Sequence, residues 1–272
     1  MTKTIITAVA FDGMNSKRIR FIHEISKLGR IEILLLSDKL IQCLTGTKPK
    51  FGESERCYFA ESIRYVSNVY IVDDILQLQQ VSNVIANPVD MWIALDLEVF
   101  ADCEQFARQQ EINYKIFYAD ELKGYPEHNY DLTVTSGKKV LVTGCFDWFH
   151  TGHIRFFEEA SEYGDLYVVL GHDKNIKKLK GLGHPMFSEN ERKYIIGSIR
   201  FVKQAIVSSG DGWLDAEPEI EKIKPDRYVV NEDGDKDIKR LYCETKGIEY
   251  IVLKREPKPS LIRRTSTDLR GY

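Results

Sequence analysis

The sequence predicts an α/β protein made of two tandem, doubly wound domains, each with a parallel sheet. Two observations carry this prediction: short apolar runs alternate with helical patterns, and the same order of segments occurs twice along the chain. Strands that alternate with helices are typical of parallel sheets covered by helices on both faces. A length of 272 residues is enough for one large or two medium domains.

The two halves of the chain match each other over long stretches. Residues 11–39 are identical to residues 146–174 at 11 of 29 positions, and residues 51–66 are identical to residues 187–202 at 9 of 16 positions. Chance alignments rarely hold a frame over such distances, so the pattern indicates a tandem duplication. The boundary is expected after the polar stretch GYPEHNYD, which predicts a first domain at 1–136 and a second at 137–272.

The second repeat reads as alternating strands and helices. The apolar run at 166–170 is typical of a strand buried on both faces, and Gly164 is the expected stop of the helix before it. The expected strands are 139–143, 166–170, 205–208, 227–230 and 249–253, and the expected helices are 154–163, 189–202, 215–224 and 238–246.

Composition argues against several classes of protein. The net charge of −3 does not favour a large nucleic-acid surface, and no apolar run reaches the length of a membrane span. The five cysteines include no CxxC pair, which favours reduced thiols, and the N-terminus lacks the apolar core of a signal peptide. We therefore expect a cytoplasmic protein with no nucleic-acid or membrane partner.

The stretch GCFDWFHTGH at 144–153 follows a predicted strand and opens a predicted helix. Ligands of doubly wound sheets bind at the carboxyl ends of the strands, and a helix N-terminus attracts phosphate. Gly144 allows a sharp turn, and Gly152 allows close approach of the backbone to a ligand. His150 and His153 would flank the anion and stabilise charge on a transferred phosphoryl group. Their alternative role is that of solvent-facing histidines beside an ordinary turn.

Two further stretches offer phosphate contacts. NIKKLKG at 175–181 supplies lysines after the next strand, either as a solvated charged loop or as the source of a lysine that holds a triphosphate. RRTSTDLR at 263–270 combines arginines with hydroxyl residues, either as a helix N-cap or as a second phosphate cradle.

Together these motifs resemble the HxGH nucleotidyltransferases, especially cytidylyltransferases such as those acting on glycerol 3-phosphate or ethanolamine phosphate, whose signature reads G-x-F-D-x-x-H-x-G-H. KKLKG, ENER, SIRFV and RTSTDLR follow in the family's order, and the resemblance covers essentially all of 138–272. It implies a Rossmann-like nucleotidyltransferase fold. It also implies transfer of CMP from CTP to a polyol, amino-alcohol or sugar phosphate or a phosphonate, with release of pyrophosphate. Mg²⁺ is expected with the triphosphate, although the sequence shows no metal-ligating cluster.

The resemblance also assigns roles to individual residues. His150, His153 and Lys180 would be catalytic, with Lys177 as the reserve candidate for the lysine. Asp147 would hold the loop more than act on the substrate. The nucleotide-binding positions would be Gly144, Cys145, Phe146, Asp147, Gly152, Lys177, Asn231, Asp233, Arg264, Thr265, Ser266 and Thr267.

The base and the acceptor stay open. TSTDLR lies between the cytidylyltransferase and adenylyltransferase patterns, and the KKLKG spacing is as similar to the adenylyltransferase that makes ADP-heptose as to a cytidylyltransferase. CTP is the favoured nucleotide, and the alternative is ATP with a sugar phosphate or a cofactor precursor. A further alternative is a protein that binds a nucleotide without catalysis, although the intact motifs of the second repeat argue against it.

The first repeat has lost the motif residues. Asn15 and Arg18 stand where the second repeat has its two histidines, and Thr45 stands at the position of Lys180. We therefore interpret 1–136 as a degenerate, non-catalytic copy and 137–272 as the catalytic domain. The chain is expected to be a monomer with an internal pseudo-dimer, or a homodimer, that binds one nucleotide per chain. The alternative is that the first repeat binds a ligand of its own.

Overall fold

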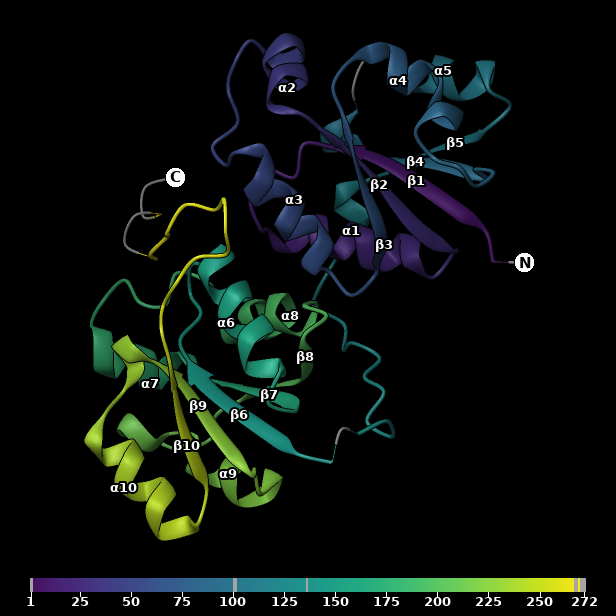
Figure 1. Ribbon diagram of the computed structural model, residues 1–272. Coiled ribbons are helices and arrows are strands. Elements are labelled where there is room, and N and C mark those ends of the chain that lie inside the picture. Colours follow the sequence, from purple (N-terminus) through teal and green to yellow (C-terminus); the bar gives the residue numbers. More distant parts are fainter. Residues whose placement is uncertain (1, 100–101, 136, 267–268, 270–272) are drawn as a thin grey trace. The chain divides into compact units, whose positions relative to one another are not determined.

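The computed structural model describes residues 2–99, 102–135, 137–266 and 269. The chain divides into two compact units, Met1–Gly124 and Tyr125–Tyr272. Each unit holds a five-stranded sheet with helices on both faces (Figure 1). The division falls before the boundary predicted for the repeats because the segment after Gly124 packs on the second unit, where the His128 ring stacks on Tyr194 with 4.6 Å between centroids.

The first unit has the strand order β3-β2-β1-β4-β5, with all neighbours parallel. Helices α4 and α5 cover one face, and α1 and α3 cover the other (Figure 1). The strands are β1 (Thr4–Val9), β2 (Arg30–Leu36), β3 (Val66–Val72), β4 (Met91–Leu95) and β5 (Asn113–Phe117). The helices are α1 (Ser16–Ser26), α2 (Asp38–Thr45), α3 (Glu53–Ser62), α4 (Ile75–Gln79) and α5 (Cys103–Gln109), with short 3₁₀ turns η1 (Val81–Asn83), η2 (Asp96–Glu98) and η3 (Ala119–Glu121).

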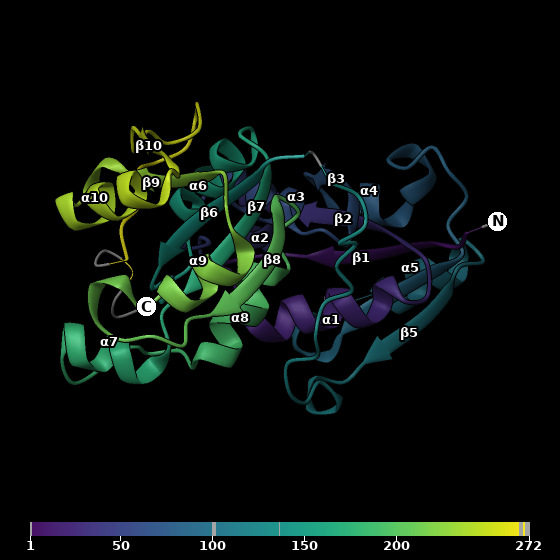
Figure 2. The ribbon, with the colours of Figure 1, turned by 90° about the horizontal axis from the view of Figure 1, so that it is seen from below.

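The second unit has the order β10-β9-β6-β7-β8, again with all neighbours parallel (Figure 2). Helices α6 and α8 lie on one face, and α9 and α10 lie on the other (Figure 1). The strands are β6 (Lys139–Gly144), β7 (Asp165–Leu170), β8 (Val202–Val207), β9 (Arg227–Asn231) and β10 (Glu249–Leu253). The helices are α6 (Thr151–Ser161), α7 (Asp173–Lys180), α8 (Glu189–Gly197), α9 (Glu217–Ile223) and α10 (Asp237–Lys246), with 3₁₀ turns η4 (Gly212–Leu214) and η5 (Glu232–Gly234).

A buried arginine ties the strand ends to a helix in the same way in both units. Arg192 of α8 donates to the carbonyl oxygens of the residues just after β6 and β7, Cys145 and Gly171, and to that of Phe187. It also forms an ion pair with Asp173, the first residue of α7. Arg56 of α3 makes the corresponding contacts with Phe51, Ala10, Leu36 and Asp38. Together with the shared strand order, this agreement means that the two halves use the same internal framework.

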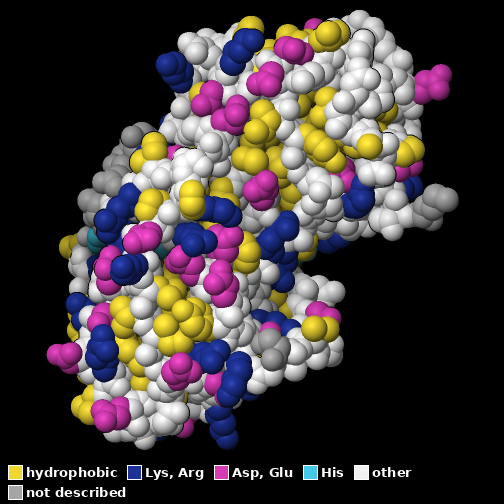
Figure 3. All heavy atoms as spheres, viewed as in Figure 1, with side chains coloured by type: hydrophobic (Ala, Val, Ile, Leu, Met, Phe, Trp, Pro, Cys, Tyr) yellow, Lys and Arg dark blue, Asp and Glu magenta, His cyan; other side chains and the backbone are white. Residues whose placement is uncertain are grey.

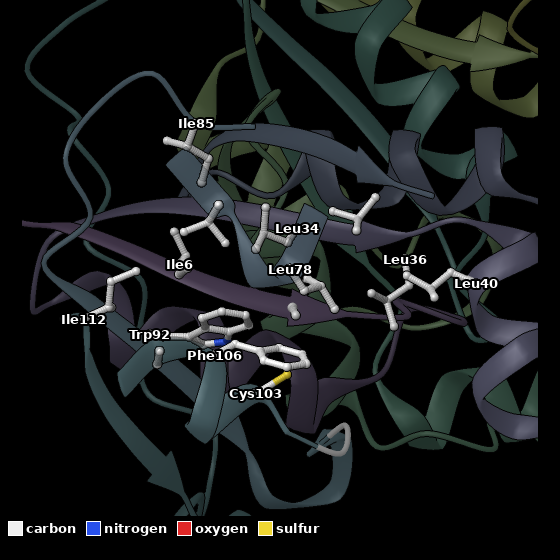
Figure 4. Close-up of a cluster of buried hydrophobic side chains, with 14 of the residues drawn as sticks. Ile6, Leu34, Leu36, Leu40, Leu78, Ile85, Trp92, Cys103, Phe106 and Ile112 are labelled. Atoms are coloured by element: carbon white, nitrogen blue, oxygen red, sulfur yellow. The ribbon is translucent and has the colours of Figure 1, made fainter. Parts of the chain in front are cut away.

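The apolar core lies between each sheet and its helices. In the first unit, the Trp92 indole and the Phe106 ring belong to one buried cluster between the sheet and α5 (Figure 4). In the second unit, Leu141 and Val169 from the sheet pack against Ile220 of α9. Apolar burial on both faces of the sheet explains why β2 and β7 read as nearly continuous apolar runs in the sequence.

Three segments differ from the sequence-based expectations. The lysine-rich stretch 175–181 is not a loop, because α7 covers it up to Lys180, with the His172 side chain as N-cap and the lysines near the favourable C-terminal end. The helix expected at 189–202 ends at Gly197, and β8 begins at Val202 beside β7. The described residues 261–266 form no helix, so the hydroxyl motif does not open one within this range.

The surface carries both signs of charge, and Lys, Arg, Asp and Glu side chains are interspersed over the visible face of each unit (Figure 3). Among the described residues, no helix is both long and apolar enough to cross a membrane. The five cysteines are free thiols.

His23 on α1 is expected to titrate far below its usual range. Burial lowers the pKa of His23 to about 4, and the charge of Lys27 acts in the same direction; the ring stacks on Tyr65 at 4.4 Å. Because this pKa is below the unfolded value, the unfolded chain binds more protons between pH about 6.5 and about 4, and stability falls as the pH falls through this window. The expected loss is up to about 3 kcal/mol.

The measurement is a proton NMR titration of the imidazole, together with urea unfolding at both ends of the window. His23→Gln should show a smaller pH dependence than the parent chain. A His23 ring that titrates near 6.5 would contradict this expectation.

Candidate functional site

The GCFDWFHTGH stretch forms the turn between β6 and α6. Gly144 is the last residue of β6, and a Cβ there would lie 2.7 Å from the Phe146 ring, so the turn requires glycine. Phe146 has a φ of 52°, a conformation that residues with side chains rarely adopt. Phe11 has a φ of 54° at the corresponding place in the first unit, so both units keep the same turn.

His150 and His153 stack on each other at the start of α6, with ring centroids 4.0 Å apart. His150 is the N-cap: its Nδ1 accepts from the Gly152 N–H at 3.0 Å, and His153 Nδ1 accepts a longer bond of 3.4 Å from the His150 N–H. Because each Nδ1 accepts, each neutral ring carries its proton on Nε2 and can donate from there. A Cβ at Gly152 would lie 2.9 Å from His150 Nδ1, so this glycine makes room for the cap.

The His153 ring is held in its neutral form. Burial lowers the pKa of His153 well below its ordinary value, and His150, Arg255 and Lys180 act in the same direction. Phe149 stacks on the ring at 5.4 Å, and Phe146 meets it edge-on at 5.3 Å. The lowered pKa favours the uncharged form of this ring near neutral pH.

An open cavity with a volume of about 200 Å³ lies where β6 and β9 end. We call it the main cavity. It brings together most of the predicted positions, although they come from segments far apart in the sequence. These positions are Gly144, Cys145, Phe146, Asp147, His150, Gly152, His153, Lys180, Asn231, Asp233 and Ser266. Lys180 also lies close to the Cys145 thiol, and its charge acts against the rise in the pKa of Cys145 that burial causes.

The remaining predicted positions lie elsewhere. Arg264 lines a small adjoining pocket of about 20 Å³, which shares Gly152 with the main cavity. Lys177 lines a separate cavity beside α7. Thr265 is half-buried and is not part of these linings, and Thr267 lies outside the described residues.

Asp147 holds a loop, the role that the resemblance implied for it. Its carboxylate accepts hydrogen bonds from the backbone N–H groups of Met186 and Phe187, at 2.8 and 3.0 Å. Asp12 makes the same pair of contacts with Lys50 and Phe51 in the first unit. The loop before α8 is therefore fixed to the turn that carries the histidines.

The sequence analysis did not single out several residues that line the main cavity. Arg255 is the arginine among them. Arg255 follows β10, and its guanidinium forms an ion pair with Asp233 at 2.7 Å and lies 3.4 Å from the Arg264 carbonyl oxygen. Its position at the carboxyl end of a parallel strand was the available signal. Thr143, Trp148 and His184 also line the main cavity.

The first unit fills the corresponding place with its own side chains. Asn15 caps α1 by accepting from the Arg18 N–H at 2.8 Å. Arg18, at the position of His153, is buried and forms an ion pair with Glu98 from the turn after β4, and its Nε donates to that carboxylate at 2.8 Å. Arg18 Nη1 also donates to the Gly13 carbonyl oxygen at 2.8 Å. An internal salt bridge thus stands where the second unit has an imidazole donor.

Two stacked imidazoles and a lysine meet beside a helix N-terminus at the carboxyl edge of a parallel sheet, the place where doubly wound α/β domains bind phosphate-bearing ligands. The chain belongs to the cytidylyltransferase-like family, whose model matches residues 141–269.

Curated relatives support the same family. The chain is 35% identical over 120 residues to an FAD synthase of Ferroglobus placidus. The matched stretch covers 43% of this chain and 75% of that protein. An FAD synthase of Pyrococcus horikoshii is 32% identical over 142 residues, with 48% of this chain and 93% of that protein covered. The bifunctional protein HldE of Campylobacter concisus is 32% identical over 162 residues, or 59% of this chain, and the match spans only 33% of HldE.

Proposed function

We propose that the second unit transfers AMP from ATP to a small phosphorylated acceptor and releases pyrophosphate. The observation that supports nucleotidyl transfer is the meeting of His150, His153 and Lys180 in one cavity at the start of α6. The sequence alone favoured CTP. The relatives favour ATP instead, because the product named in FAD synthase contains an adenylyl group.

The reaction is an in-line displacement. An oxygen of the acceptor's phosphate forms a bond to the α-phosphorus while the bond from that phosphorus to the oxygen bridging to the β-phosphate breaks, and pyrophosphate leaves with the electron pair. The Nε2–H groups of His150 and His153 and the Lys180 ammonium would stabilise charge on the phosphate oxygens. The α6 N-terminus would add its dipole.

Mg²⁺ fits this proposal as a companion of the triphosphate. Among the described residues, no group of three or more His, Cys, Asp or Glu side chains is placed to hold a metal ion. Mg²⁺ in nucleotide sites takes much of its coordination from phosphates and water, so a protein cage is not needed. When bound, the ion would neutralise phosphate charge, and we assign it to the nucleotide.

The first unit is, in this proposal, a duplicated copy that no longer binds a nucleotide. The Arg18–Glu98 ion pair supports this, because a triphosphate would have to displace a carboxylate that is only 11% exposed from its guanidinium partner. Titration calorimetry of the full chain should therefore give one nucleotide per chain. Two equivalent sites would contradict the proposal.

The direct test is pyrophosphate release with ATP and CTP in parallel. Each nucleotide is offered with a sugar phosphate, glycerol phosphate, a phosphonate and flavin mononucleotide, and His153→Ala serves as the inactive control. Release with ATP and one acceptor, lost in the variant, is the expected result. Release with CTP alone would return the base to the cytidylyl assignment. Nucleotide binding without turnover across the panel would favour a protein that binds the nucleotide without catalysis.

A further inference from the structure

A second cavity, of about 430 Å³, lies beside the main cavity. We call it the α7 cavity. It is lined by Asp173, Lys174 and Lys177 of α7 and by Leu182, Gly183, His184, Pro185 and Met186 of the following loop. His184 lines both cavities, so they are neighbours at this imidazole.

Helix α7 contributes a lysine to each cavity. Lys180 lines the main cavity, and Lys177, three residues earlier on the same side of the helix, lines the α7 cavity. The acid in the α7 cavity, Asp173, is engaged by the buried Arg192 guanidinium at 2.7 Å. The charge left to meet a ligand is therefore positive and comes from Lys174 and Lys177, with His184 as a further hydrogen-bonding group.

The loop that carries His184 is tied to Asp147 through its backbone. His184 Nδ1 lies 3.7 Å from the Asp147 carboxylate, which also binds the backbone of Met186. In the same loop, the Leu182 and Met186 side chains are 87% and 61% exposed. Apolar side chains that converge with a few charged groups in a cavity are typical of sites for small organic molecules.

We propose that the α7 cavity binds the acceptor, with its phosphate between Lys177 and His184 and its body against Leu182 and Met186. This inference rests on the proposed function, because it places the attacking phosphate beside the cavity that holds the triphosphate. The lining has cations and apolar groups but no unengaged carboxylate. The acceptor class is therefore a phosphate monoester with an uncharged, partly apolar body, rather than an amino-alcohol phosphate. Lys177 accordingly serves the acceptor and not the nucleotide.

The kinetic test compares Lys177→Ala with Lys178→Ala. Lys178 is an exposed neighbour on the same helix that is in neither lining, so its variant is the matched control. Lys177→Ala should raise the KM for the acceptor about tenfold or more, the effect of losing one charge-assisted hydrogen bond, and leave the KM for ATP unchanged. A parallel rise in the KM for ATP would overturn the proposal and return Lys177 to the nucleotide site.

A binding test separates this inference from the proposed function. The full chain is saturated with a non-hydrolysable ATP analogue, inorganic phosphate is titrated in, and the His184 imidazole is followed by NMR. A saturable shift that weakens about tenfold in Lys177→Ala supports the acceptor site. If the analogue binds but phosphate leaves His184 unmoved, the acceptor site is wrong while the nucleotide site stands. If the analogue itself does not bind, the proposed function fails, and this inference fails with it.

Discussion

Replacing His150 by asparagine is expected to lower kcat/KM by about 10²–10³-fold while the second unit stays folded. The imidazole has two tasks at one position. Its Nδ1 caps α6 by accepting from the Gly152 N–H, and its Nε2–H would donate to a phosphate oxygen during transfer. Asparagine can keep the first task, since Asn15 caps α1 by accepting from the Arg18 N–H, but its shorter side chain cannot perform the second.

The control is His150→Ala, which removes both tasks. It should lose activity to a similar extent and also lose about 1 kcal/mol of stability, because an N-cap is gone. Pyrophosphate release measures the first effect, and urea unfolding of the parent and both variants measures the second. A His150→Asn variant that turns over at the parent rate would show that the imidazole is only a cap.

Replacing Arg192 by alanine is expected to destabilise the second unit by about 3–5 kcal/mol. Arg192 is 1% exposed, and its guanidinium is hydrogen-bonded to three carbonyl oxygens and to the Asp173 carboxylate. Removing it leaves the ends of β6 and β7 without their donor and leaves a cavity beneath the turn that carries the histidines. Loss of nucleotide binding should accompany the loss of stability.

Arg56→Ala is the matched variant in the first unit, where the same contacts recur. Tryptophan fluorescence during urea unfolding can tell the units apart, because Trp92 lies in the first and Trp148 and Trp213 lie in the second. Arg56→Ala should lower the midpoint reported by Trp92 and spare nucleotide binding. Equal loss of nucleotide binding in both variants would contradict a site built from the second unit alone.

Local pattern predicted the parallel α/β architecture and the turn that carries the histidines. The apolar runs at 166–170 and 227–230 identified buried parallel strands, because strands covered on both faces exclude polar residues. The GCFDWFHTGH turn carries its constraints within ten residues, since Gly144 lies against the Phe146 ring and the Gly152 N–H donates to His150 Nδ1. Such short-range geometry can be read from the local sequence. The match between the two halves of the chain can also be read from the sequence.

Only the tertiary structure decided which distant residues complete the site. Arg255 reaches Asp233 from the segment after β10, and Arg18 meets Glu98 across 80 positions of sequence. Lys177 and Lys180 look equivalent in the sequence, yet the loop after α7 divides them between two cavities. The sequence by itself determined the strands of the second unit, most of its helices and the histidine turn, because backbone preferences and apolar periodicity act over a few residues. The lining of the cavities depends on how loops from separate strands pack together, which no local pattern specifies.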